Sequence, residues 1–102
     1  MIHVVATIRL KPGCRDEYLE ILNSIVSDVR GEKGCLTYGP TIDTETDIEI
    51  QEITGENTVT MIESWESVEA LKEHFKAPHM LSYREKAKDL FESISVRVLK
   101  PA

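Results

Sequence analysis

The fold is decided at residues 2–13, which read IHVVATIRLKPG. Up to Leu10 the apolar side chains alternate with other residues, which predicts a strand over residues 2–10 that is buried on one face. The Lys-Pro-Gly at 11–13 is typical of a turn. From residue 14 to residue 30 the apolar period becomes helical, and the expected buried stripe contains Tyr18, Leu22, Ile25 and Val29. The chain therefore opens with a strand, a tight turn and an amphipathic helix.

The middle of the chain predicts two more strands. Gly31 or Gly34 is expected to end the first helix in the left-handed conformation that glycine adopts easily. A strand is predicted at residues 36–43, with a kink or bulge at Gly39-Pro40, since a central strand tolerates that pair poorly. The isoleucines at 48, 50 and 53 suggest a further extended piece, and alternation predicts another strand at Thr58–Trp65.

Two helices and a last strand complete the pattern. Ser67 is a good N-cap for a short helix whose expected apolar stripe is Val68, Leu71 and Phe75. Pro78 should end that helix and begin the next one. Alternation at residues 94–99 predicts the final strand.

These elements follow the order β-α-β-β-α(α)-β, which is the split βαβ pattern of a ferredoxin-like α+β fold. We expect residues 1–102 to form a single domain, with an antiparallel sheet that carries its helices on one face. The other face is half apolar, with Val5, Ile62 and Leu99 among polar neighbours. A homodimer in which two such sheets close into an α+β barrel would cover it, and a solvated sheet face is the alternative.

Charge and hydropathy exclude several classes of function. The 102 residues carry a formal net charge of −6, which disfavours binding to nucleic acid. No apolar run approaches the roughly 18 residues of a membrane span, and the first residues do not have the pattern of a signal peptide. Cys14 and Cys35 suit a reducing compartment, so we expect a cytoplasmic protein. The segment 43–56 contains acids and no base, as expected of a solvated loop or strand edge, or of a partner surface.

Familiar cofactor and nucleophile motifs are missing. The sequence contains no GxGxxG, Walker loop, HExxH, CxxC or Gly-x-Ser-x-Gly. We therefore expect chemistry without a tightly held cofactor or metal, such as proton transfer, hydrolysis, isomerisation, or oxidation of a substrate that supplies its own electrons.

The residues best suited to chemistry gather between positions 63 and 80. His74 and His79 are five residues apart, which is not the spacing of a helical metal pair. At about 100° per residue His74 flanks the apolar stripe of its helix, so its ring can reach the space between helix and sheet. His79 lies in the first turn of the next helix, whose dipole favours a neutral imidazole. Either ring could act as a general base, or both could be ordinary, partly exposed histidines.

Four other side chains could form a pocket. Trp65 is either a core aromatic or a wall whose indole N–H donates to a ligand. Glu63 shares the apolar strand face and should have either a raised pKa or an ion-pair partner such as Arg9 or Arg97. Tyr38 and Tyr83 could supply hydroxyl groups or could simply pack.

In this region the sequence resembles the antibiotic-biosynthesis monooxygenase family, and within it the bacterial quinol monooxygenases. The resemblance covers nearly the whole chain, and its order and spacing are more specific than any single motif. The matching positions are Arg9, Pro12-Gly13, Gly34-Cys35, Tyr38-x-Pro40, Glu63-x-Trp65-x-Ser67, His74, Pro78-His79-Met80 and Arg97-x-Leu99-x-Pro101.

The resemblance implies a dimeric α+β barrel that oxidises a small hydroquinone or phenol with O₂ and no cofactor. It suggests His74 as the base, Trp65 and His79 as donors or orienting groups, and a pocket lined by Leu71, Met80 and Tyr83. Haem degradation is not expected, because Ala6 or Thr7 stands where haem-degrading members have asparagine, and Arg84 stands near their haem ligand. The alternatives are a non-catalytic dimeric module that binds a quinone or similar aromatic metabolite, and an isomerase or dehydratase on the same barrel.

Overall fold

A computed structural model describes residues 1–102 and contains the predicted order of elements. None of its helices is both long enough and apolar enough to cross a membrane. The elements are β1 (Ile2–Leu10), α1 (Arg15–Arg30), β2 (Cys35–Thr41), β3 (Thr58–Trp65), α2 (Val68–Lys76), α3 (Pro78–Ala87), a 3₁₀ turn (Lys88–Leu90) and β4 (Phe91–Leu99).

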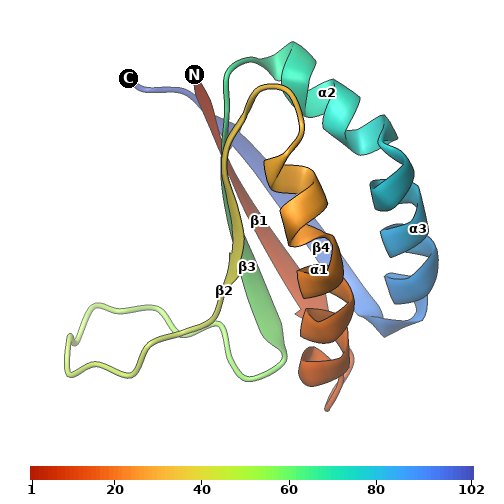
Figure 1. Ribbon diagram of the computed structural model, residues 1–102. Helices are drawn as coiled ribbons and strands as arrows, with labels where there is room; N and C mark the ends of the chain where they lie inside the picture. Colours follow the sequence, from red (N-terminus) through yellow and green to blue (C-terminus); the bar gives the residue numbers. More distant parts are fainter.

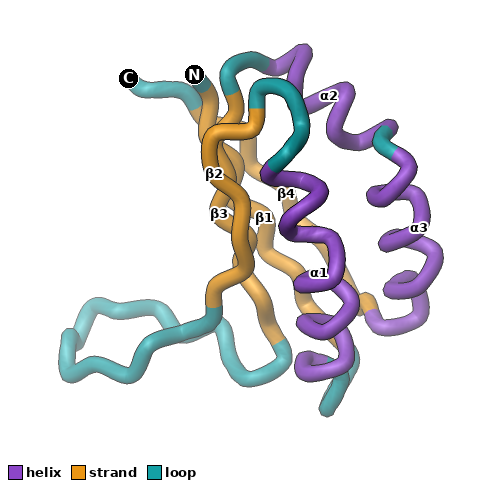
Figure 2. The backbone as a smooth tube through the Cα atoms, viewed as in Figure 1, coloured by secondary structure: helices purple, strands orange, loops and turns teal.

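The four strands form one antiparallel sheet in the order β2-β3-β1-β4, as the ferredoxin-like pattern predicts. All three helices lie on the same face of the sheet, and the other face is bare (Figures 1 and 2). β1 is central, and its even-numbered residues from Val4 to Leu10 are buried beneath the helices. The predicted strand face is therefore confirmed.

Burial of the α1 stripe against β1 and β3 holds the two layers together. Tyr18 and Val29 are fully buried on α1, and Val59 and Trp65 are fully buried on β3. Each side chain of this size contributes roughly 1.5–3 kcal/mol when it is removed from water. The core therefore lies under α1, toward the β2-β3-β1 part of the sheet.

Two predictions for the middle of the chain are wrong. The β2–β3 register shifts between Cys35 and Thr37, not at Gly39-Pro40. β2 is an edge strand that pairs only with β3, so Pro40 needs no bulge to be accommodated. Residues 42–57 form no strand either, and this arm projects from the bare side of the sheet (Figure 2). A carboxylate closes the arm, since Asp43 accepts hydrogen bonds from the backbone N–H groups of Thr54 and Gly55.

The helix ends agree with the sequence in part. The Ser67 hydroxyl accepts a hydrogen bond from the Ala70 N–H, and Pro78 begins α3, as predicted. Gly31 caps α1 in a right-handed conformation, whereas Gly34 has a φ of +87°. On α2, Leu71 and His74 are the buried residues. The predicted stripe is therefore rotated toward His74, and Val68 and Phe75 are about 40% exposed.

Replacing Gly34 by alanine is expected to destabilise the protein more than replacing Gly13, whose φ of +78° is similar. Each substitution has the cost of a left-handed alanine, roughly 1–2 kcal/mol. A Cβ at position 34 would also lie 2.6 Å from the Cβ of Ala70, while nothing lies within 4 Å at position 13. Overpacking should add roughly 1–3 kcal/mol at position 34. Urea unfolding of both variants measures the difference, and equal losses would contradict the tight contact.

Candidate functional site

A cavity of about 360 Å³ lies between the helices and the sheet. It exists because the helices leave β4 uncovered, so that Ile94 and Val96 face the helix side of the sheet yet are about half exposed. Most of the lining is apolar, and four lining residues carry ionisable groups other than phenols: Glu63, His74, Arg84 and Lys88. Glu63 and His74 are buried, whereas Arg84 and Lys88 are exposed. The cavity therefore has a deep end with a carboxyl and an imidazole, and a mouth with two cations.

Glu32 brings the two candidate histidines together. It lies in the turn after α1, and its Oε2 is 2.9 Å from Nδ1 of His74 and 2.7 Å from Nε2 of His79. The side chain of His74 is 2% exposed and that of Glu32 is 14% exposed, so water screens this contact only weakly. A single carboxylate thus links the turn after α1 to α2 and α3, behind the His74 ring that lines the cavity.

These contacts determine which nitrogen of each ring carries the proton. An ionised carboxylate can only accept hydrogen bonds, so neutral His74 donates through Nδ1–H and neutral His79 through Nε2–H. Nε2 of His74 is then a free lone pair. Every fully buried side-chain nitrogen or oxygen in the protein has a hydrogen-bond partner. Nε2 of His74 has no such partner, so it is not fully buried, and the open space next to His74 is the cavity that this residue lines.

The same surroundings keep His74 uncharged near neutral pH. Burial is the largest influence and lowers the pKa of His74 below its ordinary value, while the hydrogen bond and charge of Glu32 act in the opposite direction. The neighbouring His79 and Arg84 side chains lower the pKa of His74 further. A neutral imidazole with its lone pair toward an apolar cavity is suited to accept a proton from a bound hydroxyl group.

A hydrogen bond from the Trp65 indole positions the Glu63 carboxyl group. The indole is fully buried, and its Nε1–H donates to Oε1 of Glu63 at 2.9 Å. Donation to a ligand, which the sequence suggested, is therefore excluded in this arrangement. The expected pairing of Glu63 with Arg9 or Arg97 is also wrong, because both arginines alternate onto the bare face of the sheet.

Burial raises the pKa of Glu63, and the Trp65 hydrogen bond opposes this rise. The sequence-based expectation of a raised pKa is thus supported. Oε2 of Glu63 has no protein partner, so by the same reasoning as for His74 it reaches the cavity. A carboxyl oxygen and the His74 nitrogen therefore both face the deep end.

Hydroxyl groups complete this end of the cavity. The hydroxyl oxygens of Tyr18 and Tyr83 are 2.6 Å apart, and both side chains are buried. Tyr18 has no other partner, so its hydrogen is satisfied only if it donates to Tyr83. The Tyr83 hydrogen is then free to point into the cavity that this residue lines. Burial raises the pKa of both groups and that of Tyr38, so all three remain neutral donors.

Five of the eight residues singled out in the sequence line the cavity: Tyr38, Glu63, His74, Met80 and Tyr83. The other three lie behind it. Leu71 is part of the core, Trp65 stacks on the His74 ring with centroids 4.6 Å apart, and His79 lies across Glu32. Glu32 could not be predicted from the sequence, because its partners are 42 and 47 residues away and no local pattern marks it.

Comparison with known proteins identifies the family of the chain. The model of the family described as "Antibiotic biosynthesis monooxygenase" matches residues 1–86. The chain belongs to this family. It is 36% identical over 103 residues to the Escherichia coli K12 protein named "Probable quinol monooxygenase YgiN", and the match covers 99% of this chain and 98% of that protein.

Two solved structures superimpose closely on the chain. PA3566 from Pseudomonas aeruginosa is 25% identical with a TM-score of 0.81, over 99% of this chain and 93% of that one. Rv0793 from Mycobacterium tuberculosis is also 25% identical, with a TM-score of 0.80, over 99% of this chain and 94% of that one. The resemblance inferred from the sequence is confirmed at the level of family and fold.

Proposed function

We propose that the protein is a monooxygenase that oxidises a small hydroquinone or phenol with O₂ and without a cofactor. The observation that carries the proposal is the His74 imidazole, held through Nδ1 by Glu32 and presenting its free Nε2 to an apolar cavity. The family and the name of the Escherichia coli relative support an oxygenase. A volume of about 360 Å³ lies at the small end of the range for small-molecule sites.

The chemistry begins with a proton transfer. His74 Nε2 takes the proton of the ring hydroxyl, and the resulting phenolate is electron-rich enough to give one electron to O₂. The two radicals combine at a ring carbon, and one oxygen atom stays on the ring while the other leaves as water. The quinol supplies all the electrons, so that a quinol and O₂ give a hydroxyquinone and water. Tyr83 and Tyr38 can donate hydrogen bonds to the developing oxyanion.

Oxygen consumption by the purified, metal-stripped protein with a chemically reduced naphthoquinol tests this function. Saturable uptake above autoxidation, with a hydroxynaphthoquinone as product, is the expected result. Uptake with only the quinone and hydrogen peroxide as products would show an oxidase. Binding of the quinol without any uptake would favour the alternative of a non-catalytic module, and turnover without O₂ would favour an isomerase or dehydratase.

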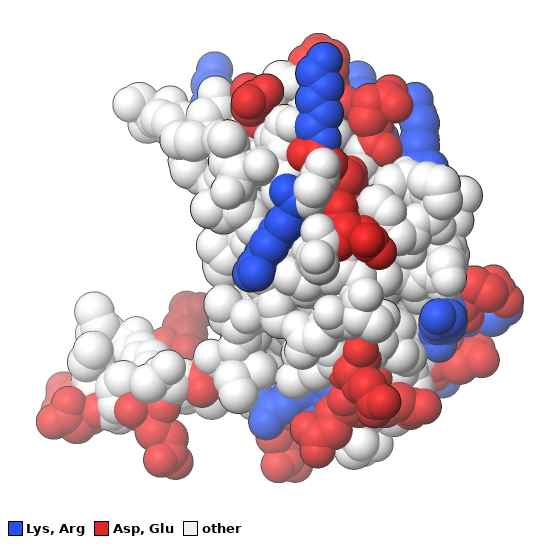
Figure 3. All heavy atoms as spheres, in the orientation of Figure 1, with Lys and Arg blue, Asp and Glu red and all other residues white.

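We also propose that the protein is a homodimer whose sheets pack through their bare faces. Val5 and Ile62 are neighbours on that face, and Ile62 is 46% exposed. The arm of residues 42–57 extends on the same side and carries Ile50, which is 91% exposed (Figures 1 and 3). A second copy would cover both.

We further expect the protein to act in a reducing compartment such as the cytoplasm, since both cysteines are free. Cell fractionation checks this expectation.

Substitution of Ile62 by aspartate is expected to convert this dimer into a monomer, because the charge would be buried in an apolar interface. Light scattering after gel filtration should give twice 11.6 kDa for the wild type and 11.6 kDa for the variant. Leu81→Asp is the matched control, since Leu81 is 56% exposed on α3, away from the sheet. A monomeric wild type, or equal loss of the dimer in both variants, would contradict the proposed interface.

A further inference from the structure

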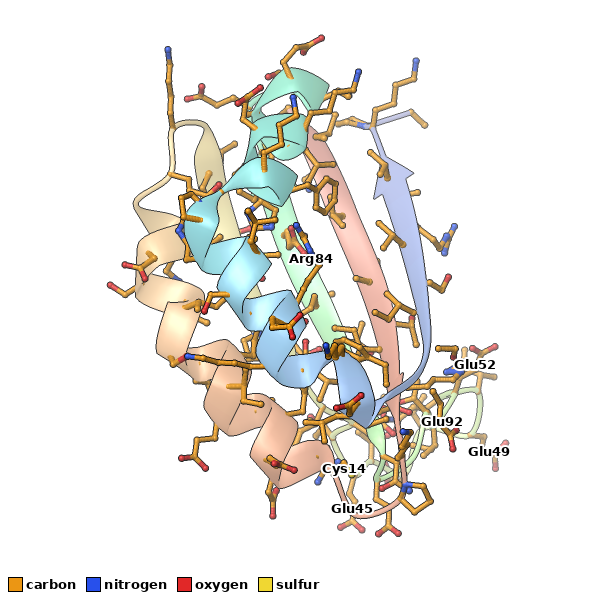
Figure 4. All side chains as sticks on the ribbon, turned by 90° about the vertical axis from the view of Figure 1, so that its right-hand side faces the viewer. Cys14, Glu45, Glu49, Glu52, Arg84 and Glu92 are labelled. Carbon is orange, nitrogen blue, oxygen red and sulfur yellow. The ribbon has the colours of Figure 1, made fainter.

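The mouth of the cavity carries an arginine that no carboxylate neutralises. Arg84 extends from α3 toward the end of α2 (Figure 4), where its Nη2 donates to the backbone oxygen of Phe75 at 2.6 Å. That contact fixes the guanidinium beside the cavity that both residues line. No ion pair involves Arg84, although the chain has 18 acids and only 12 lysines and arginines.

The second cation of the mouth lies just beyond α3, at the first residue of the 3₁₀ turn. Lys88 lines the same cavity, and its Nζ lies 2.7 Å from Oε1 of Glu85, so it already has a carboxylate partner. Arg84 is therefore the free positive charge of the mouth. Its remaining N–H donors have the fork geometry that binds a carboxylate through two parallel hydrogen bonds.

The deep end of the cavity has the opposite character. Glu63 places a carboxyl group there, and the Glu32 carboxylate lies behind the His74 ring. The free Nε2 of His74 and Oε2 of Glu63 are acceptors that suit a hydroxyl donor. An anionic group would be repelled by these carboxyl groups and would also be taken out of water. The two ends therefore differ in what they accept: a neutral hydroxyl inside and an anion at the mouth.

We propose that the cavity binds an aromatic hydroxy acid, with its ring hydroxyl at His74 and its carboxylate on Arg84. The apolar walls formed by β1 and β4 hold the ring between these groups. This inference narrows the proposed function to substrates that bear an acidic substituent, and it takes from that proposal only the ring hydroxyl at the deep end. Arg84 then fixes the direction in which the ring enters, so that the hydroxyl arrives at the base.

Calorimetric binding of two redox-inert probes tests the inference. The probes are 6-hydroxy-2-naphthoate and its isosteric neutral amide, 6-hydroxy-2-naphthamide. The wild-type protein should bind the carboxylate about tenfold more tightly than the amide, as expected for one charge-assisted pair near the surface. Arg84→Gln should abolish this preference, mainly by weakening the binding of the carboxylate. The preference should also decrease with added salt, because the pair is exposed.

Lys86→Gln is the matched control, because it removes one positive charge from the same helix outside the cavity. It should retain the preference for the carboxylate. Equal affinity of the wild type for the two probes, or equal loss of preference in both variants, would overturn the inference. These outcomes do not depend on turnover: a preserved preference without O₂ uptake would refute the oxygenase and leave the ligand class standing. Uptake of O₂ without the preference for the carboxylate would support the oxygenase and refute the proposed ligand class.

Discussion

Replacing His74 by alanine is expected to lower kcat for quinol oxidation by about 10²–10⁴-fold, the usual contribution of a general base. Nε2 of His74 is the one imidazole nitrogen that the structure places at the cavity with a free lone pair. Without it, the phenolic proton must pass to water, and the electron-rich phenolate forms rarely. Oxygen uptake measures the loss of kcat. KM is determined separately, because the side chains that contact the quinol ring remain in the variant.

Folding must be controlled in this experiment, because His74 is buried against Trp65 and Tyr38. Circular dichroism and binding of a redox-inert naphthol establish that the variant retains its cavity. Added imidazole can enter the space left by the missing ring and should restore part of the rate. A folded variant with an unchanged kcat would remove His74 from the mechanism.

The elements of this fold follow from local patterns in the sequence. Alternation in β1 and β3 and the helical stripe of α1 are properties of neighbouring residues, so the predicted elements and their order agree with the structure. The extended piece suggested by the isoleucines at 48, 50 and 53 is not a strand, and this has a physical reason. The isoleucines there have no strand beside them, and the arm is closed by Asp43 instead of by a ladder.

The site was predicted in part, because some of its geometry is local and some is not. The angle of His74 around its helix is set by α2 alone, so its approach to the sheet could be worked out from spacing. The partner of Glu63 could not be predicted in this way. Trp65 is only two residues away, but the spacing alone does not show that its indole N–H turns back along the strand to the Glu63 carboxyl group. Which groups meet across the sheet and the loops depends on packing that no single segment encodes.

Glu32 is the clearest case, and its substitution by glutamine gives the second large expected effect. A carboxylate accepts the N–H of both His74 and His79. An amide has one accepting oxygen and one donating NH₂ group, so it can satisfy only one histidine in its present tautomer. Loss of the correct tautomer behind a catalytic histidine is costly in serine proteases, about 10⁴-fold. Since the amide in Glu32→Gln would still satisfy one ring, we expect kcat to fall by a smaller factor, about 10–100-fold.

The pH profile distinguishes this positioning role from a merely structural one. His74 acts in its neutral form, so kcat/KM should rise with pH as its proton is lost. Burial lowers the pKa of His74 and the Glu32 carboxylate raises it, so this limb lies on the acid side of the ordinary histidine range. Removing the negative charge in Glu32→Gln removes the opposing influence. The limb should therefore move to still lower pH while the plateau falls.

A matched substitution separates this effect from a general loss of charge. Glu73 lies next to His74 in sequence but is exposed on α2, where it pairs only with Lys76 at 3.6 Å. Glu73→Gln should leave both the plateau and the acid limb where they are. If Glu32→Gln lowered the plateau without moving the limb, the carboxylate would be supporting the fold of the turn after α1. A limb that moves together with the plateau ties the loss to the proton on His74, because the Glu32 carboxylate is hydrogen-bonded to that ring and raises its pKa.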